Sequence, residues 1–178
     1  MSASTKKISL LAVGIALFVV LSLCLQVPVF ENYYLCLEYV VMAVYSYSFG
    51  TFSGIVVGFA GVILYCLVIS GLRGMPGWSL GNIVIGIGLG LMFKTTRNWK
   101  STVLKLMTEC FVIVAVTALG ILVVKSETES LLYSQPFLIR AAKNTSAFIA
   151  DSVMLIISLP ICKVLDPHTE RIMPDLHV

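Results

Sequence analysis

Long apolar segments alternate with short polar connections along the whole of this chain. An α-helix needs about 20 predominantly apolar residues to cross a bilayer, and six segments reach or approach that length. The pattern predicts an all-α integral membrane protein, a bundle of six transmembrane helices that forms a single transmembrane domain over residues 1–178. The predicted spans are residues 8–27, 35–49, 52–69, 78–93, 102–124 and 142–163.

The composition agrees with a membrane protein and excludes several other classes. Hydrophobic residues make up 58% of the 178 residues and charged residues 12%, whereas about a quarter of a typical soluble domain is charged. Because the apolar residues are spread over the whole length, no room is left for a second, soluble domain. The basic residues are also too scattered to form a nucleic-acid-binding surface.

The distribution of basic residues predicts how the bundle is oriented in the membrane. Six spans place both termini on one side, and eight basic residues lie on that side: Lys6, Lys7, Lys94, Arg97, Lys100, Lys105, Lys163 and Arg171. The opposite side holds Arg73, Lys125, Arg140 and Lys143. Since basic residues accumulate on the cytoplasmic side, we expect a multi-pass protein of the cell membrane with both termini in the cytoplasm.

The stretch from Ser70 to Asn82 combines four glycines, a proline and three residues that can recognise a polar molecule, Arg73, Trp78 and Asn82. Glycine lets a backbone turn tightly, and proline stops a preceding helix from continuing. This composition predicts a shaped loop that binds a ligand. The alternative is a turn at the membrane interface, with the tryptophan in the aromatic belt and the arginine at a lipid headgroup.

Other polar residues fall in or beside the predicted spans at the same, external end. Asn144 and Asp151 share one face of the last span, and Glu38 lies near the start of the second. A carboxylate at membrane depth is costly, so it indicates either a functional site or a structural hydrogen bond to a neighbouring helix. Together with the loops at 26–34, 70–77 and 125–139, these residues predict a ligand pocket. Its candidate residues are Tyr33, Tyr34, Glu38, Arg73, Trp78, Asn82, Asn144 and Asp151.

Several of these features occur together in one known family. The six short spans, the four-residue spacing of Ala12 and Ala16, the Tyr34–Tyr39 entry to the second span, the Ser-Phe-Gly-x-x-x-Gly turn at 48–54 and the glycine-rich loop all contribute. Over nearly its whole length the chain resembles the substrate-binding S component of an energy-coupling factor (ECF) transporter.

The resemblance implies an importer of a vitamin in a prokaryotic membrane. In that family the small-residue face of the first helix docks on a transmembrane coupling subunit (the T component), so Ala12 and Ala16 would be the docking residues. Two cytoplasmic ATPase subunits drive the cycle, and the S component topples in the membrane to release its ligand inside. The chain has no Gly-x-x-x-x-Gly-Lys-Ser/Thr loop, which agrees with ATP hydrolysis by a partner.

The resemblance implies that the vitamin is the transported ligand, and no prosthetic group is expected. The resemblance favours the branch of cobalamin, pyridoxine, hydroxymethylpyrimidine and riboflavin carriers, and within it cobalamin is the first choice. No N-terminal histidine motif of the metal-specific members is present, which argues against cobalt or nickel and against a metal site. The two histidines, His168 and His177, lie in the predicted cytoplasmic tail.

Two other classes of function remain open from the sequence. A secondary transporter would use a buried acid such as Glu38, Glu109 or Asp151 for proton coupling, and a structural membrane subunit would bind no ligand. An intramembrane enzyme is not expected, because the spans hold neither a cluster of metal ligands nor a serine–histidine pair.

Overall fold

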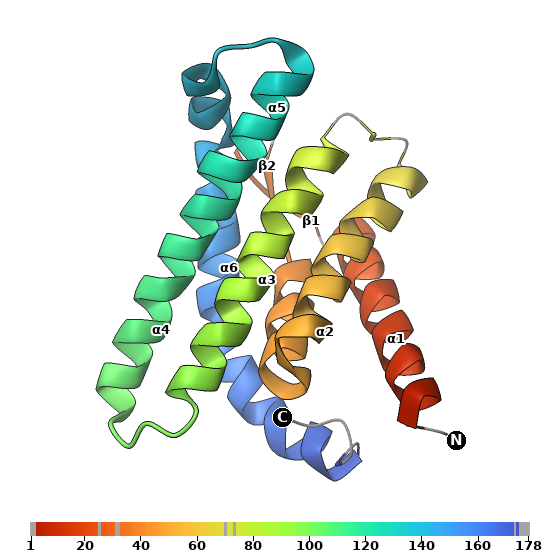
Figure 1. The fold of residues 1–178 in the computed structure, drawn as a ribbon, viewed down its shortest axis with the longest axis vertical. Helices are drawn as coiled ribbons and strands as arrows, with labels where there is room; N and C mark the ends of the chain where they lie inside the picture. The colour runs from red at the N-terminus through yellow and green to blue at the C-terminus, as the bar shows by residue number, and fades with distance from the viewer. Residues whose placement is uncertain are drawn as a thin grey trace.

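The structure is a computed structural model that describes residues 3–24, 26–30, 33–69, 71–72, 74–172 and 174. It is a helical bundle with one short β-hairpin (Figure 1). The elements are α1 (Ala3–Cys24), β1 (Gln26–Phe30), β2 (Tyr33–Cys36), α2 (Glu38–Val68), α3 (Met75–Thr96), α4 (Thr102–Thr117), the π-helix η1 (Ala118–Lys125), α5 (Ser126–Tyr133) and α6 (Phe137–Ile172).

Among the described residues, five helices are long and apolar enough to cross a membrane. The prediction of six separate helices is therefore not matched, although the helical class is confirmed. The difference lies in α2, which contains both the second and the third predicted span as two helical arms separated at Gly50. Inside it, Gly50 has a non-helical backbone with φ 83° and ψ 173°.

The backbone at Gly50 folds α2 back on itself, so that its two arms lie against each other. Contacts across the bend pair residues at equal distances on either side of it. A Cβ placed on Gly58 would lie 2.7 Å from the sulfur of Met42, and one on Gly54 would overlap the side chain of Ser46. Figure 1 shows the first arm in orange and the second in gold, running in opposite directions. Because of this reversal, the start of α1 and the end of α6 lie at the same end of the bundle (Figure 1).

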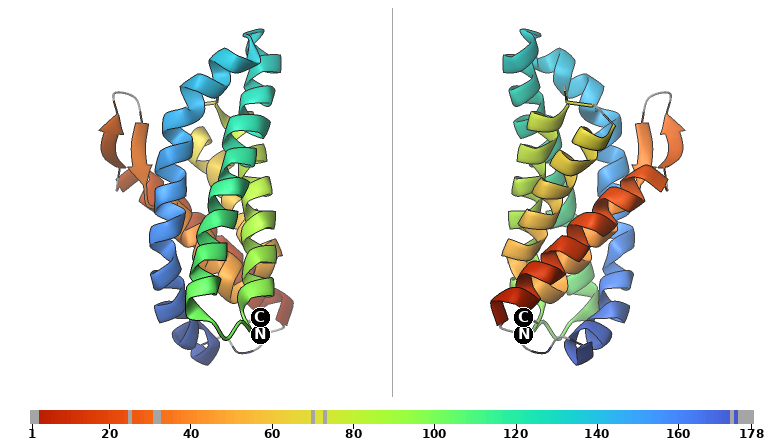
Figure 2. Two further views of the ribbon diagram at one scale, coloured as in Figure 1. Left: turned by 90° about the vertical axis from the view of Figure 1, so that its left-hand side faces the viewer. Right: turned by 90° about the vertical axis from the view of Figure 1, so that its right-hand side faces the viewer.

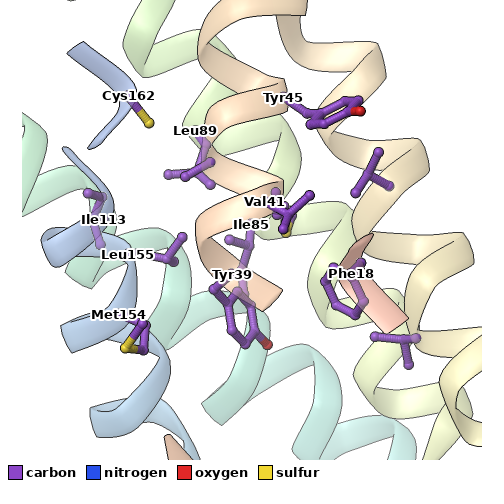
Figure 3. Packing of buried hydrophobic residues seen from close by; sticks show 14 of the residues in the cluster. Phe18, Tyr39, Val41, Tyr45, Ile85, Leu89, Ile113, Met154, Leu155 and Cys162 are labelled. Carbon is purple, nitrogen blue, oxygen red and sulfur yellow. The ribbon is translucent and has the colours of Figure 1, made fainter. Parts of the chain in front are cut away.

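The second arm of α2 supports the core together with α3. The two elements approach closely because glycines of α3 face the second arm: Gly86 packs on Ile55, and Gly90 packs on Thr51. Buried apolar side chains of α2, α3 and α6 complete one continuous core. Figure 3 shows Ile85 and Leu89 of α3 and Leu155 of α6 turned toward the same interior.

The helix α1 packs on this hairpin through one face. Gly14 lies against Tyr45 and Val57, and the Tyr45 hydroxyl donates a hydrogen bond to the Leu10 carbonyl at 3.0 Å. Phe18 is fully buried on the same face. The other face of α1 is exposed in the isolated chain.

The connections predicted as loops contain more regular structure than expected. Residues 26–30 and 33–36, which were predicted in a loop and the start of a span, form two antiparallel strands, and the second strand, β2, contacts α6 (Figure 2). The predicted loop at 125–139 is largely helical, because α4, η1 and α5 run on without a break to Tyr133. Likewise α6 begins before residue 142 and continues to Ile172, through most of the predicted tail.

We expect Gly50→Ala to lower the stability of the protein. A residue with a Cβ is strained in the backbone region of Gly50, at a cost of about 1 to 3 kcal/mol. Thermal or chemical unfolding of the purified protein in detergent measures this loss. Gly74→Ala is the matched control, because Gly74 has φ −80° and no atom within 4 Å of an added Cβ. Equal stability of the two variants would show that the bend does not need glycine.

Candidate functional site

A series of hydrogen-bonded, buried polar groups connects α3 with α2. It lies in the half of the bundle opposite the start of α1 and the end of α6. The indole N–H of Trp78 donates to the Tyr39 hydroxyl at 3.0 Å, and that hydroxyl donates to Asn82 Oδ1 at 3.1 Å. The amide nitrogen of Asn82 donates in turn to the Gly58 carbonyl at 3.1 Å. Tyr39 is 1% exposed and Asn82 0%, so water does not compete for these bonds.

Two carboxyl groups lie beside these hydrogen-bonded side chains. Asp151 of α6 interacts with the Tyr39 hydroxyl and, electrostatically, with the positive charge of Lys125. Glu38, which precedes Tyr39 at the start of α2, is completely buried and also acts electrostatically on the Tyr39 hydroxyl. The Tyr39 hydroxyl is therefore the point where polar groups from α2, α3 and α6 meet. We call Glu38, Tyr39, Trp78, Asn82 and Asp151 the Tyr39 cluster.

A second polar group joins α5 to α6 and is centred on Asn144. Its amide nitrogen donates to Ser126 Oγ at 3.0 Å and to Glu129 Oε2 at 3.1 Å. The same Glu129 oxygen lies 3.7 Å from a guanidinium nitrogen of Arg140. Asn144 and Glu129 are both buried. These contacts hold the end of the α4–η1–α5 segment against α6.

The two polar groups lie at the same end of the bundle because the start of α3 packs on the η1–α5 junction. A Cβ on Gly77, next to Trp78, would lie 3.0 Å from the Lys125 carbonyl and 3.2 Å from Glu129 Cγ. The Trp78 ring also packs edge-on against Tyr65 of α2, with 5.7 Å between ring centroids. Movement of the first turn of α3 would therefore disturb both groups.

Most of the site residues predicted from the sequence lie together in the structure. Glu38, Trp78, Asn82 and Asp151 belong to the Tyr39 cluster, and Asn144 is the centre of the neighbouring group. Tyr33 and Tyr34 lie in β2, which contacts α6, but their side chains are outside the described part of the structure, as is Arg73.

The sequence interpretation missed several residues of the site. Tyr39 is not among the predicted site residues, although it follows Glu38 directly in the sequence. Ser126 and Glu129 fall in the predicted loop at 125–139. Their three-residue spacing puts them on one face only because this segment is helical. Arg140 precedes Asn144 by one helical turn, a relation that the longer observed α6 makes visible.

The chemistry of the site suits recognition of a neutral or cationic polar ligand rather than catalysis. It offers an amide, a phenol, an indole N–H and carboxylates, which are hydrogen-bonding and stacking groups. No group of three or more His, Cys, Asp or Glu residues in the described part of the chain is placed to hold a metal ion.

Comparison with known proteins identifies the family. Residues 2–167 match the family model described as "ECF-type riboflavin transporter, S component". The chain belongs to this family. The expected resemblance to ECF S components is thereby confirmed. The match does not support cobalamin as the ligand, and riboflavin, one of the alternatives, fits better.

Curated relatives match a smaller part of the chain. UPF0397 proteins from Lactococcus lactis subsp. cremoris strains NZ9000 and MG1363 are 34% identical over 94 residues, which is 51% of this chain and 50% of each relative. The relative from strain SK11 has the same identity over 48% of its length. The match thus spans about half the length of these relatives.

We expect Tyr39→Phe to destabilise this ECF S component by about 1 to 3 kcal/mol, the usual cost of leaving buried hydrogen-bonding groups unpaired. The change removes the acceptor of the Trp78 indole and the donor to Asn82, while the ring is kept. Unfolding in detergent measures the effect. Tyr47→Phe is the control, since it keeps a ring that packs edge-on against Phe93 at 4.8 Å. An equal loss in both variants would argue against a special role for the Tyr39 hydroxyl.

Proposed function

We propose that the protein captures riboflavin at the end of the bundle that holds the Tyr39 cluster. The observation that carries this proposal is the match of residues 2–167 to the riboflavin S-component family, in a chain that gathers polar groups from three helices at one end. We further propose that this end faces the outside of a prokaryotic cell and that both termini are cytoplasmic, as the distribution of basic residues predicts.

The groups of the cluster are complementary to the two parts of riboflavin. Its flat ring system carries a polar edge with an N–H donor between two carbonyl acceptors, and the amide of Asn82 can both donate to and accept from such an edge. The aromatic ring of Trp78 can stack on the flat system. The sugar-like chain carries hydroxyl donors, which suit the carboxylates of Glu38 and Asp151.

Binding requires that the cluster exchange its internal bonds for bonds to the ligand. In the structure the Trp78, Tyr39 and Asn82 side chains satisfy one another. A ligand that replaces every lost hydrogen bond gains little binding free energy from each of them. A ligand that leaves one buried group without a partner loses about 1 to 3 kcal/mol of binding free energy. The exchange therefore favours selectivity for a ligand with the matching pattern of donors and acceptors. Tyr33, Tyr34, Arg73 and Asn144 remain predicted contacts around this centre.

Transport would depend on partners that supply energy. We propose that Ala12 and Ala16 of α1 dock on a transmembrane coupling subunit, that two cytoplasmic ATPases drive the cycle, and that the S component topples to release riboflavin inside. Both alanines are exposed, whereas the opposite face of α1 is occupied by its contacts with α2. Small residues on an exposed membrane helix allow another helix to approach closely.

We expect Asn82→Ala and Asp151→Asn each to weaken riboflavin binding about tenfold, the effect of losing one hydrogen bond in a dry site. Quenching of flavin fluorescence by the purified protein measures the dissociation constant. Thr95→Ala on α3 and Glu170→Gln on α6 are controls, because both residues are exposed at the opposite end of the same helices. Unchanged affinity in folded Asn82→Ala and Asp151→Asn proteins would place the riboflavin site elsewhere.

We expect Ala16→Trp to impair partner docking without affecting riboflavin affinity. An indole at a close interface costs about 1 to 3 kcal/mol, so recovery of the complex should fall about tenfold. Copurification with the coupling subunit is the measurement, and Ala115→Trp on the exposed face of α4 is the matched control. Full recovery of the Ala16→Trp complex would exclude this face of α1 as the docking surface.

A further inference from the structure

The turn between α5 and α6 carries an exposed apolar surface at the end of the bundle that holds the Tyr39 cluster (Figure 1). Its four large apolar side chains are Leu131 (76% exposed), Leu132 (54%), Leu138 (78%) and Ile139 (49%). We call these four residues the apolar tip. Exposed apolar side chains that lie together mark a contact with a membrane or with another protein, so the tip indicates an interaction surface.

The turn has the opposite polarity from one that faces water. The ten residues at 130–139 include no charged residue. Six of them are exposed, and among these six only Ser134 has a polar side chain. The neighbouring polar groups are turned inward: Ser130 Oγ donates to the Gln135 carbonyl at 2.6 Å, and Glu129 is buried against Asn144. Since turns at an aqueous surface are built mainly from polar residues and glycine, this arrangement favours apolar surroundings.

The length of the helical segment that leads to the turn places the tip at a membrane surface. Thr102–Tyr133 is one membrane-length segment of 32 residues, which corresponds to about 48 Å at a rise of about 1.5 Å per residue. A bilayer with its headgroup regions is about 40 to 45 Å thick. The segment begins directly after the exposed cation Lys100 and Ser101, which suit one headgroup layer. Its other end, with the tip, then reaches the opposite headgroup layer.

The tip also continues the exposed apolar surface of the same segment. Val103, Met107 and Phe111 of α4 are 72%, 65% and 75% exposed. In a chain of a membrane-embedded family, large apolar side chains exposed along a span contact lipid. An exposed acid, Glu127, and an exposed base, Lys143, border the tip one helical turn away on α5 and α6, where lipid headgroups can solvate them. Lipid is therefore the occupant that the surrounding surface favours.

A tyrosine and an arginine at the base of the tip are residue types of the membrane interface. The Arg140 guanidinium carbon lies 4.6 Å from the centroid of the Tyr133 ring. Tyrosine is enriched at the level of the headgroups, and arginine can lay its aliphatic stem along apolar surface while its charge stays in a polar layer. Arg140 also lies 3.7 Å from Glu129, which bonds to Asn144. The tip is thereby connected to the polar group beside the Tyr39 cluster.

We propose that the apolar tip inserts into the lipid headgroup layer on the side of the membrane that holds the Tyr39 cluster. Its occupant is the lipid of that leaflet, with the apolar side chains buried about 5 to 10 Å into the boundary between headgroups and acyl chains, as in interfacial amphipathic helices. Insertion holds the α5–α6 turn, and with it the contact between Glu129 and Asn144, at a fixed depth in the membrane. The proposal does not depend on which vitamin is bound.

Tryptophans added singly to the full chain in lipid nanodiscs test the depth of the tip. Leu131→Trp and Leu138→Trp report from the two sides of the turn, and both positions are exposed enough to accept an indole. Phe111→Trp on α4 is the lipid-facing control, and Glu170→Trp, exposed near the end of α6, is the aqueous control. Quenching by lipids brominated on the acyl chain is compared with quenching by iodide in the buffer. The emission of the unsubstituted protein, which has two tryptophans, is subtracted.

We expect brominated lipid to quench both tip indoles about as strongly as that of Phe111→Trp, and iodide to quench them far less than that of Glu170→Trp. The reverse pattern would place the tip in water and overturn the proposal. Protection from both quenchers would also overturn it, because a protein surface, such as a second copy of this chain, would then cover the tip. The measurements need no riboflavin, so their failure is distinguishable from a failure of the proposed function.

Discussion

The reversal of α2 at Gly50 is the constraint on which the rest of this structure depends. A glycine with φ 83° and ψ 173° folds two apolar arms against each other, and the arms then form the support on which α1 and α3 pack. One arm starts with Glu38 and Tyr39, while the other presents the Gly58 carbonyl to Asn82. The Tyr39 cluster therefore relies on this local backbone conformation. The bend itself borders a cavity at the other end.

The two ends of the bundle differ in the way their polar groups are satisfied. In the Tyr39 cluster, side chains of α2, α3 and α6 bond to one another in a closed interior, where unpaired groups are costly. Beside the bend, by contrast, Lys94 and Arg97 line a cavity of about 450 Å³.

The sequence predicted the features that follow from regular periodicity. Apolar segment length indicated the membrane helices, and the helical spacing of Asn144 and Asp151 placed them on one face. The number and order of the spans then placed Glu38, Trp78 and Asn82 at the same end of the bundle as these two residues. Features that depend on a single backbone angle or on tertiary contact were not predictable in this way. The motif at 48–54 predicted a turn between two spans, but it did not predict the backbone angles of Gly50 that close this turn. The role of Tyr39 follows only from the partners that other helices bring to it. The choice of ligand rested on family resemblance alone, because no residue pattern in the sequence identifies a particular vitamin. Cobalamin was the first choice, and the family match does not support it.

The most direct test of the central claim is a side-by-side titration of riboflavin, cobalamin, pyridoxine and hydroxymethylpyrimidine into the purified, folded protein. The account predicts that riboflavin binds at one site per chain and that the other three vitamins do not displace it. Preferential binding of another vitamin would contradict the assignment of the ligand. Absence of binding to all four would contradict the interpretation of the Tyr39 cluster as a vitamin site.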